Sequence, residues 1–176
     1  KGSDDDVLTL ASGVPSWAAS AAGGKVGQVQ YTQITDTEET TSTSYVTIPT
    51  LEVTITPSAT TSKILIQGYL AVGYGASAHT LFQLFRDTTQ IALGDAAGSR
   101  GQDLFGCRSD GAIMSYSAWP FAFQWVDSPS STSAITYTFK WRVNTATVYL
   151  GRAYDSTDNS NYNRSPCQIA ATEILV

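Results

Sequence analysis

Strict alternation of apolar and polar residues is the feature that most constrains this chain, and it is clearest in the run AITYTFKWRV. There Ile135, Tyr137, Phe139, Trp141 and Val143 fall on one face, while Thr, Lys and Arg fall on the other. A period of two residues is that of a β-strand with one buried face. The run TVYLG follows after the turn NTA, and this order predicts the return arm of a hairpin.

Comparable runs recur along most of the chain. In WPFAFQWV, four aromatic residues share one face, which predicts a strand that builds the core, and Pro120 places its start at a sheet edge or bulge. No run shows helical spacing over more than one turn. We therefore expect an all-β fold, an antiparallel two-sheet sandwich of jelly-roll type, with a closed barrel as the alternative. The further strands are expected at 26–34, 45–48, 51–56, 63–72, 81–86, 90–93 and 168–176.

Composition narrows the class of partner. Charged residues make up only 14% of the 176 residues, the net charge is −5, and no basic run is present, so nucleic acid is not an expected partner. The chain has no unbroken apolar stretch of about 18 residues, and we expect no membrane insertion. Cys107 and Cys167 are far apart in the sequence, and two unpaired thiols are favoured over one disulfide.

Two of the expected strands are apolar on both faces. In TLFQLFR, Phe82 and Leu84 alternate with Leu81 and Phe85, and KILIQGYLAVGY shows the same pattern. Because a strand in a two-layer sandwich faces only one core, the second face needs another cover. Contact between subunits is the expected cover, and a loop of the same chain is the alternative.

Several segments resemble the C-terminal head domain of tail-fibre and receptor-binding proteins of tailed bacteriophages, especially marine phages. The resemblance is carried by VLTLASGVPSWA, VTITPSATTSKILI, WVDSPSSTSAITYTF and CQIAATEI. It implies a homotrimeric β-sandwich at the tip of a virion tail fibre. It also implies attachment to a host-cell surface receptor, for which a glycan is expected, and contact with other fibre segments. The sequence alone does not give threefold symmetry.

The N-terminal region differs from the remainder. Residues 1–3 are expected to be a remnant of a cleaved affinity tag, and residues 4–24 a segment next to the fibre shaft that ends in a small-residue linker. Residues 25–176 are expected to form the head. Trp17 and residues 7–10 should then pack against the head or against neighbouring chains.

The segment GRAYDSTDNSNYNRSP is the first candidate for a glycan-contacting loop. Sugars are held by aromatic faces that pack on their C–H surfaces, and by amide, carboxylate and guanidinium groups that bond their hydroxyls. A plain solvated loop is the alternative, and a calcium site is another, although the spacing lacks the D-x-D-x-D-G pattern. The candidate ligand-binding residues are Arg152, Tyr154, Asp158, Asn159, Asn161, Tyr162 and Arg164.

A second candidate is the segment from Gly94 to Gly111, which is long for a hairpin connection. Long ordered loops are disproportionately functional, although five glycines could simply make this one mobile. Its candidate residues are Arg100, Gln102, Asp103, Arg108 and Asp110.

Catalysis is not expected, nor is any cofactor. A Ser-His-Asp triad would need the single histidine, His79, as its base, but the sequence contains no G-x-S-x-G nucleophile elbow. Binding of a metal on an oligomer axis is an alternative role for His79. A depolymerising hydrolase would need paired carboxylates, for which Asp95 with Asp103 or Asp155 with Asp158 are candidates. The competing functions are a structural virion module and a stand-alone carbohydrate-binding module.

Overall fold

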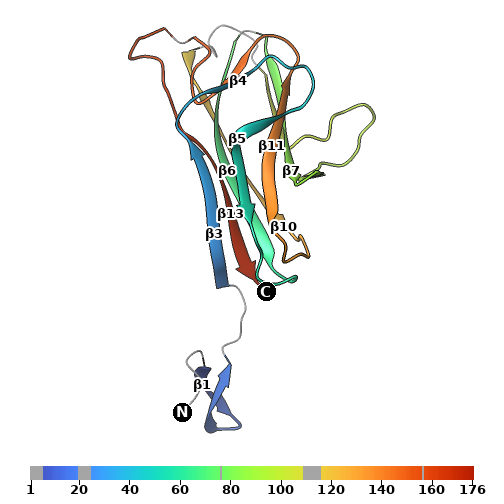
Figure 1. Cartoon of the computed structure of the whole chain (residues 1–176), viewed down its shortest axis with the longest axis vertical. Helices are drawn as coiled ribbons and strands as arrows, with labels where there is room; N and C mark the ends of the chain where they lie inside the picture. The colour runs from blue at the N-terminus through green and yellow to red at the C-terminus, as the bar shows by residue number, and fades with distance from the viewer. Residues whose placement is uncertain (1–5, 20–24, 76, 109–115, 156) are drawn as a thin grey trace.

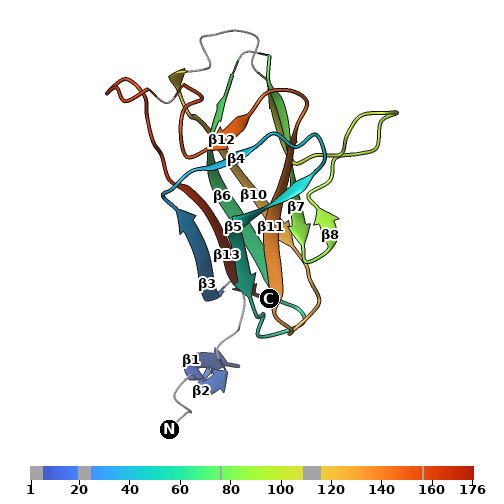
Figure 2. The same cartoon turned by 45° about the horizontal axis from the view of Figure 1, so that its top comes forward.

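The computed structural model describes residues 6–19, 25–75, 77–108, 116–155 and 157–176. In these ranges the chain forms strands β1 to β13 and no α-helix, and every strand pairing is antiparallel. No helix long and apolar enough to cross a membrane occurs in this part of the chain. The strands form a two-sheet sandwich and a separate hairpin, which lies apart from it in both views (Figures 1 and 2). The all-β prediction is confirmed.

The sandwich consists of a six-stranded and a five-stranded sheet. In the six-stranded sheet, β6 is central, with β10 on one side and β13 and β12 on the other. Its strands are β3 (Lys25–Ile34), β4 (Glu38–Thr40), β6 (Lys63–Tyr74), β10 (Trp119–Asp127), β12 (Val148–Leu150) and β13 (Cys167–Leu175). The strands of the five-stranded sheet are β5 (Val46–Ile55), β7 (His79–Arg86), β8 (Thr89–Ile91), β9 (Phe105–Arg108) and β11 (Ile135–Val143).

The connectivity is that of a jelly roll. Strands β5, β6 and β7 alternate between the two sheets, and so do β10, β11 and β12. The two sheets share no ladder, so the sandwich prediction is confirmed over the closed barrel.

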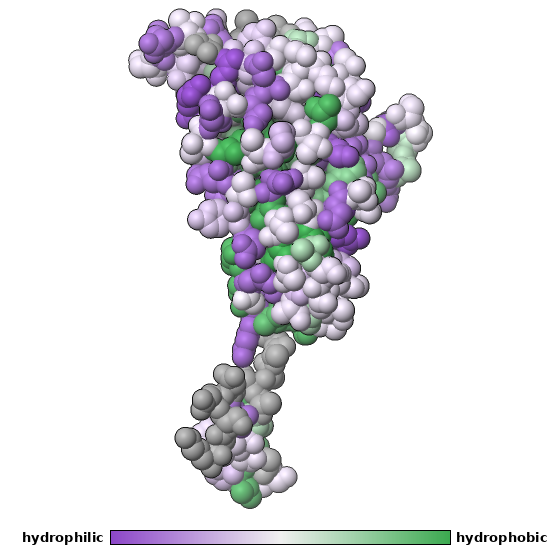
Figure 3. All heavy atoms as spheres, viewed as in Figure 1, coloured by the Kyte–Doolittle hydropathy of each residue, from purple (hydrophilic) through white to green (hydrophobic). Residues whose placement is uncertain are grey.

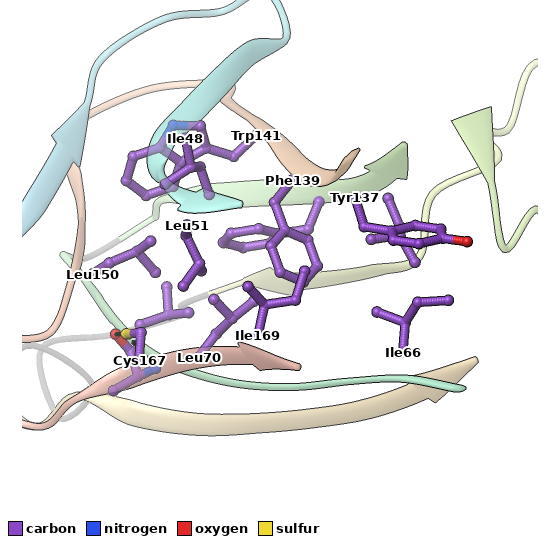
Figure 4. Packing of buried hydrophobic residues seen from close by; sticks show 14 of the residues in the cluster. Ile48, Leu51, Ile66, Leu70, Tyr137, Phe139, Trp141, Leu150, Cys167 and Ile169 are labelled. Carbon is purple, nitrogen blue, oxygen red and sulfur yellow. Dashed lines mark hydrogen bonds between the residues drawn. The ribbon is translucent and has the colours of Figure 1, made fainter. Parts of the chain in front are cut away.

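The core lies between the sheets. All five alternating residues of β11 are buried, which confirms the face predicted from AITYTFKWRV. Figure 4 shows Trp141, Phe139 and Tyr137 directed toward Ile169, Leu70 and Ile66 of the opposite sheet. Burial of these large apolar side chains is the main source of stability in such a fold.

The hairpin predicted between β11 and the run TVYLG is wrong. Strand β12 pairs with β4 and β6, in the other sheet. Both edges of β11 are already occupied, by β5 and β7, so no ladder position beside β11 remains for β12. The chain crosses to the opposite sheet instead, where Val148 and Leu150 are buried.

The predicted break between 45–48 and 51–56 is also wrong, because β5 runs through Pro49 as one strand. Thr47 lies opposite Lys140 and Glu52 opposite Thr138, so the extra residues of β5 form a bulge. A bulge accommodates a proline, which has no N–H to donate to the ladder. Ile48 and Leu51 on either side of it are fully buried.

Strand β10 is an edge strand, as Pro120 predicted, since it pairs with β6 alone. Its aromatic face builds the core only in its middle part: Phe121 and Phe123 pack against the core, while Trp119 and Trp125 are 37% and 39% exposed. The Phe123 ring fills the space over Gly68, where a Cβ would lie 2.0 Å from it.

The hairpin consists of β1 (Asp6–Ala11) and β2 (Val14–Ala19). Leu8 lies opposite Trp17 and Leu10 opposite Pro15, so one face is apolar. Trp17 is 52% exposed and Leu10 75% exposed, so the expected burial of this segment is not met within one chain. Residues 1–3, Asp4, Asp5 and the predicted linker at 20–24 lie outside the described residues.

Both cysteines are free and buried, which agrees with the expectation of two unpaired thiols. Cys107 lies on β9 and Cys167 on β13, in different sheets. Burial raises the pKa of the Cys107 thiol to about 12, so neither redox nor metal chemistry is favoured there.

Candidate functional site

The loop between β12 and β13 forms a pocket of about 240 Å³ at the end of the sandwich opposite the hairpin (Figure 1). In the space-filling view this loop is a largely hydrophilic lobe at the upper left (Figure 3). The pocket is lined by Arg152, Ala153, Asp155, Thr157, Asp158, Asn159, Tyr162, Asn163 and Arg164.

The two ends of the loop are anchored to the six-stranded sheet. Gly151 has φ +78°, and its N–H donates to the Ala71 carbonyl (2.9 Å) while its carbonyl accepts from the Ser165 N–H (3.0 Å). Arg152 and Arg164 then form an isolated β-bridge, which holds both guanidinium-bearing residues at the pocket. Gly73 of β6 lies directly beneath, since a Cβ there would be 2.1 Å from the Arg152 carbonyl oxygen.

Aromatic rings support the pocket from two sides. Tyr162 lies against Tyr116, with ring centroids 5.8 Å apart. On the other side the Arg152 guanidinium lies over the Tyr149 ring at 3.5 Å, and Tyr154 meets the same ring edge-on. Tyr162 therefore lines the pocket, whereas Tyr149 orients Arg152.

The charges of the pocket are balanced. The Thr157 hydroxyl and N–H donate to Asp155 at 2.8 and 3.2 Å, and these bonds lower the pKa of that carboxyl. Desolvation and the Asp155 carboxylate raise the pKa of Tyr162, which keeps its phenol protonated as a donor. Two arginines and two aspartates line the pocket, so its formal charge is balanced and it suits a neutral ligand rich in hydroxyl groups.

Five of the seven residues predicted for this loop line the pocket. Tyr154 does not, because its ring packs on the Gly75 backbone, and Asn161 does not, although its N–H donates to the Asn159 side chain at 2.9 Å. Thr157 is a lining residue that the sequence prediction missed, and Tyr116 is a supporting one. Nothing in the sequence links Tyr116 to a loop that follows some 35 residues later; only folding brings the two together.

The second candidate segment is not a single loop, since it contains β9, which pairs with β7. Gln102 donates to the Gly94 carbonyl at 2.5 Å, and Asp103 accepts from Tyr45 and from Gln83. Asp103 therefore holds the segment on the sheet, whereas the Gln102 side chain bonds within the segment.

The other members of this second group are spread apart along the chain's elements. Arg100 is exposed before β9, and Arg108 ends β9. Asp110 lies outside the described residues. The described members form no common pocket comparable to the one between β12 and β13.

Metal and acid–base groups are dispersed where the chain is described. There, no three His, Cys, Asp or Glu side chains come together as a metal site would require. His79 begins β7, and its backbone N–H donates to the Asn144 side chain at 2.7 Å. Asp155 and Asp158 both line the pocket, whereas Asp103 is held by Tyr45 and Gln83 away from it.

No known family model and no curated protein matches the chain. Among solved structures, it is similar to the structure of the infectious bursal disease virus Gt strain, with 10% identity and a TM-score of 0.43, over 97% of this chain and 42% of that one. It is also similar to the infectious bursal disease virus VP2 subviral particle, with 9% identity and a TM-score of 0.39, over 97% of this chain and 46% of that one. The chain spans less than half the length of these structures, and a likeness at this level does not bear on what it binds.

Proposed function

We propose that this domain attaches a virion to a host-cell surface by non-catalytic binding of a glycan in the pocket between β12 and β13. The observation that carries the proposal is the composition of that pocket: a tyrosine ring, amides and a balanced set of charges around a hollow of about 240 Å³. These are the groups that pack on sugar C–H faces and bond sugar hydroxyls. The resemblance of the sequence to tail-fibre head domains supplies the virion context.

The position of the pocket supports this role. The loop between β12 and β13, which forms the pocket, lies at the opposite end of the sandwich from the hairpin, which precedes the head in the chain (Figure 1). If the hairpin joins the head to a fibre shaft, the pocket faces outward at the tip. A single shallow polar site binds weakly, so attachment would depend on several copies of the site. The resemblance to tail-fibre head domains implies a homotrimer, which would carry three copies.

The proposal is tested with fluorescently labelled protein on an array of bacterial surface polysaccharides and neutral oligosaccharides. We expect Tyr162→Ala to lower binding at least tenfold, because it removes the ring that lines the pocket. Leu93→Ala, which removes an exposed apolar side chain outside the pocket, is the matched control and should bind like the unmodified chain. Equal binding by both variants would contradict the assigned site.

A structural virion module is the second candidate, favoured by the exposed apolar residues of the hairpin. It predicts binding to purified capsid or baseplate and none to the array. A stand-alone carbohydrate-binding module predicts array binding by a monomer.

A further inference from the structure

The outer face of the six-stranded sheet has a composition unlike an ordinary solvated surface. The ladders place twelve outward residues in three rows across β3, β13, β6 and β10. None of the twelve is charged. The rows, which we call the uncharged face, are Val29, Thr172, Leu65, Val126; Tyr31, Ala170, Gln67, Gln124; and Gln33, Gln168, Tyr69, Ala122.

Apolar and amide groups on this face are open to solvent. Tyr31 is 67% exposed, Val29 and Val126 are each 53% exposed, and Tyr69 is 39% exposed. Between β6, β10 and β13, small side chains leave a hollow of about 590 Å³. The hollow is rimmed by Tyr69 and by the three glutamines of β6, β10 and β13.

The outer face of the five-stranded sheet provides a contrast within the same chain. There the second apolar face of β7 is covered internally: the Lys140 ammonium lies 4.0 Å from the Phe85 ring centroid. Arg142 lies over Tyr45 in the same way, at 5.2 Å. Charged side chains of that sheet thus lie over its outward rings, whereas no charged residue is among the twelve of the uncharged face.

We propose that the uncharged face is the surface through which copies of this chain associate. Copies of a chain with net charge −5 repel one another, so they associate most readily through a face without charges. Glutamine amides both donate and accept, and can therefore bond to amides of another copy. This inference rests on the self-association within the proposed function and names its surface.

A head-to-tail contact fits this face. Tyr31 protrudes on edge strand β3, and the hollow lies beside it, over β13, β6 and β10. An edge that enters the hollow of the next copy gives a heterologous contact, which forms a ring when the rotation between copies closes. The twelve residues occupy five positions on each of four strands and present about 300 Å², so an interface of roughly 800 Å² per partner extends beyond them.

The test is the solution mass of the full chain, measured by light scattering after size exclusion at tens of micromolar. We expect three times the 18.8 kDa of one chain. Gln67→Glu with Gln124→Glu should reduce the mass to that of one chain while leaving the circular dichroism of the folded sandwich unchanged, because both positions are exposed. Thr47→Glu with Ser99→Glu adds the same charge at exposed positions off this face and should keep the mass of the unmodified chain.

The outcomes separate the surface from the self-association. A monomeric unmodified chain would overturn both. An unmodified oligomer whose mass survives Gln67→Glu with Gln124→Glu would overturn the assigned face while self-association stands. Ala122→Trp fills the hollow without adding charge; we expect it to weaken the oligomer, and an unchanged mass would overturn the head-to-tail geometry. None of these results depends on glycan binding, which the array measures separately.

Discussion

At the scale of single residues, Glu173 is the clearest case of a charge held inside the fold. It is 1% exposed at the end of β13. Its carboxylate accepts from the Gln28 amide at 2.8 Å, and from the Ser58 N–H and hydroxyl at 2.6 and 2.7 Å. Burial opposes ionisation, but these bonds outweigh it and lower the pKa of Glu173 to about 2. The side chain thus ties β3 and the β5–β6 turn to β13.

This pKa gives a signed prediction for stability against pH. The folded pKa of about 2 lies below the ordinary value of 4.5, so the contribution of Glu173 is fully present above 4.5 and is lost as the pH falls toward 2. Glu173→Gln should lower the free energy of unfolding at pH 7 by about 1–3 kcal/mol. It should also make the free energy of unfolding fall less steeply as the pH is lowered below 4.5, as measured by urea titration at several pH values. Glu39→Gln, at an exposed position of β4, is the control. If the free energy of unfolding of Glu173→Gln fell with pH as steeply as that of the unmodified chain, Glu173 would not be the source of this pH dependence.

A second residue-scale prediction concerns Gly73, which joins the core sheet to the pocket. Its missing side chain lets the Arg152 backbone approach, so Gly73→Ala should push residues 152–154 off β6. We expect a loss of about 1–3 kcal/mol, together with faster proteolysis between β12 and β13 and weaker array binding. Gly94→Ala, where a Cβ meets nothing within 4 Å, should behave like the unmodified chain. Unfolding and cleavage rates equal to the control's would contradict this role.

At the scale of elements, the alternation of apolar and polar residues predicted some strands correctly and failed for others. Alternation was sufficient for β11 and β6, since each is long and buries one full face. It did not find β4 and β9, because EET contains no apolar residue and FGCR only two. It misplaced β12 because alternation gives a strand's faces and not its partners, and both neighbours of β11 were already taken. The pocket loop was found from composition, whereas Tyr116 is brought to it only by folding.

The hairpin β1–β2 supplies the prediction at this scale. An isolated two-stranded hairpin is marginally stable in water, and its exposed Leu8, Leu10 and Trp17 need a cover. Deleting residues 1–24 should therefore weaken the oligomer, seen as a lower mass on dilution. The sandwich should keep its unfolding temperature when measured as a monomer, because its core draws on neither β1 nor β2. Collapse of the domain after the deletion would show that the hairpin belongs to the core.

At the scale of the whole molecule, the two surfaces have separate locations. The pocket lies in the loop between β12 and β13, whereas the uncharged face lies along β3, β13, β6 and β10. A single chain can therefore associate with its copies and still leave each pocket open. This separation allows attachment strength to be set by copy number.

The last prediction follows from that separation. The double variant Gln67→Glu with Gln124→Glu should retain the intrinsic affinity of each pocket, because neither residue lines it. As a monomer it should nevertheless bind a dense polysaccharide surface about 10²-fold or more weakly than the oligomer, since linked sites gain effective concentration. Surface plasmon resonance at low and high ligand density measures both quantities: the two forms should converge at low density and diverge at high density. Equal binding by monomer and oligomer at high density would show that the copies do not engage the surface together.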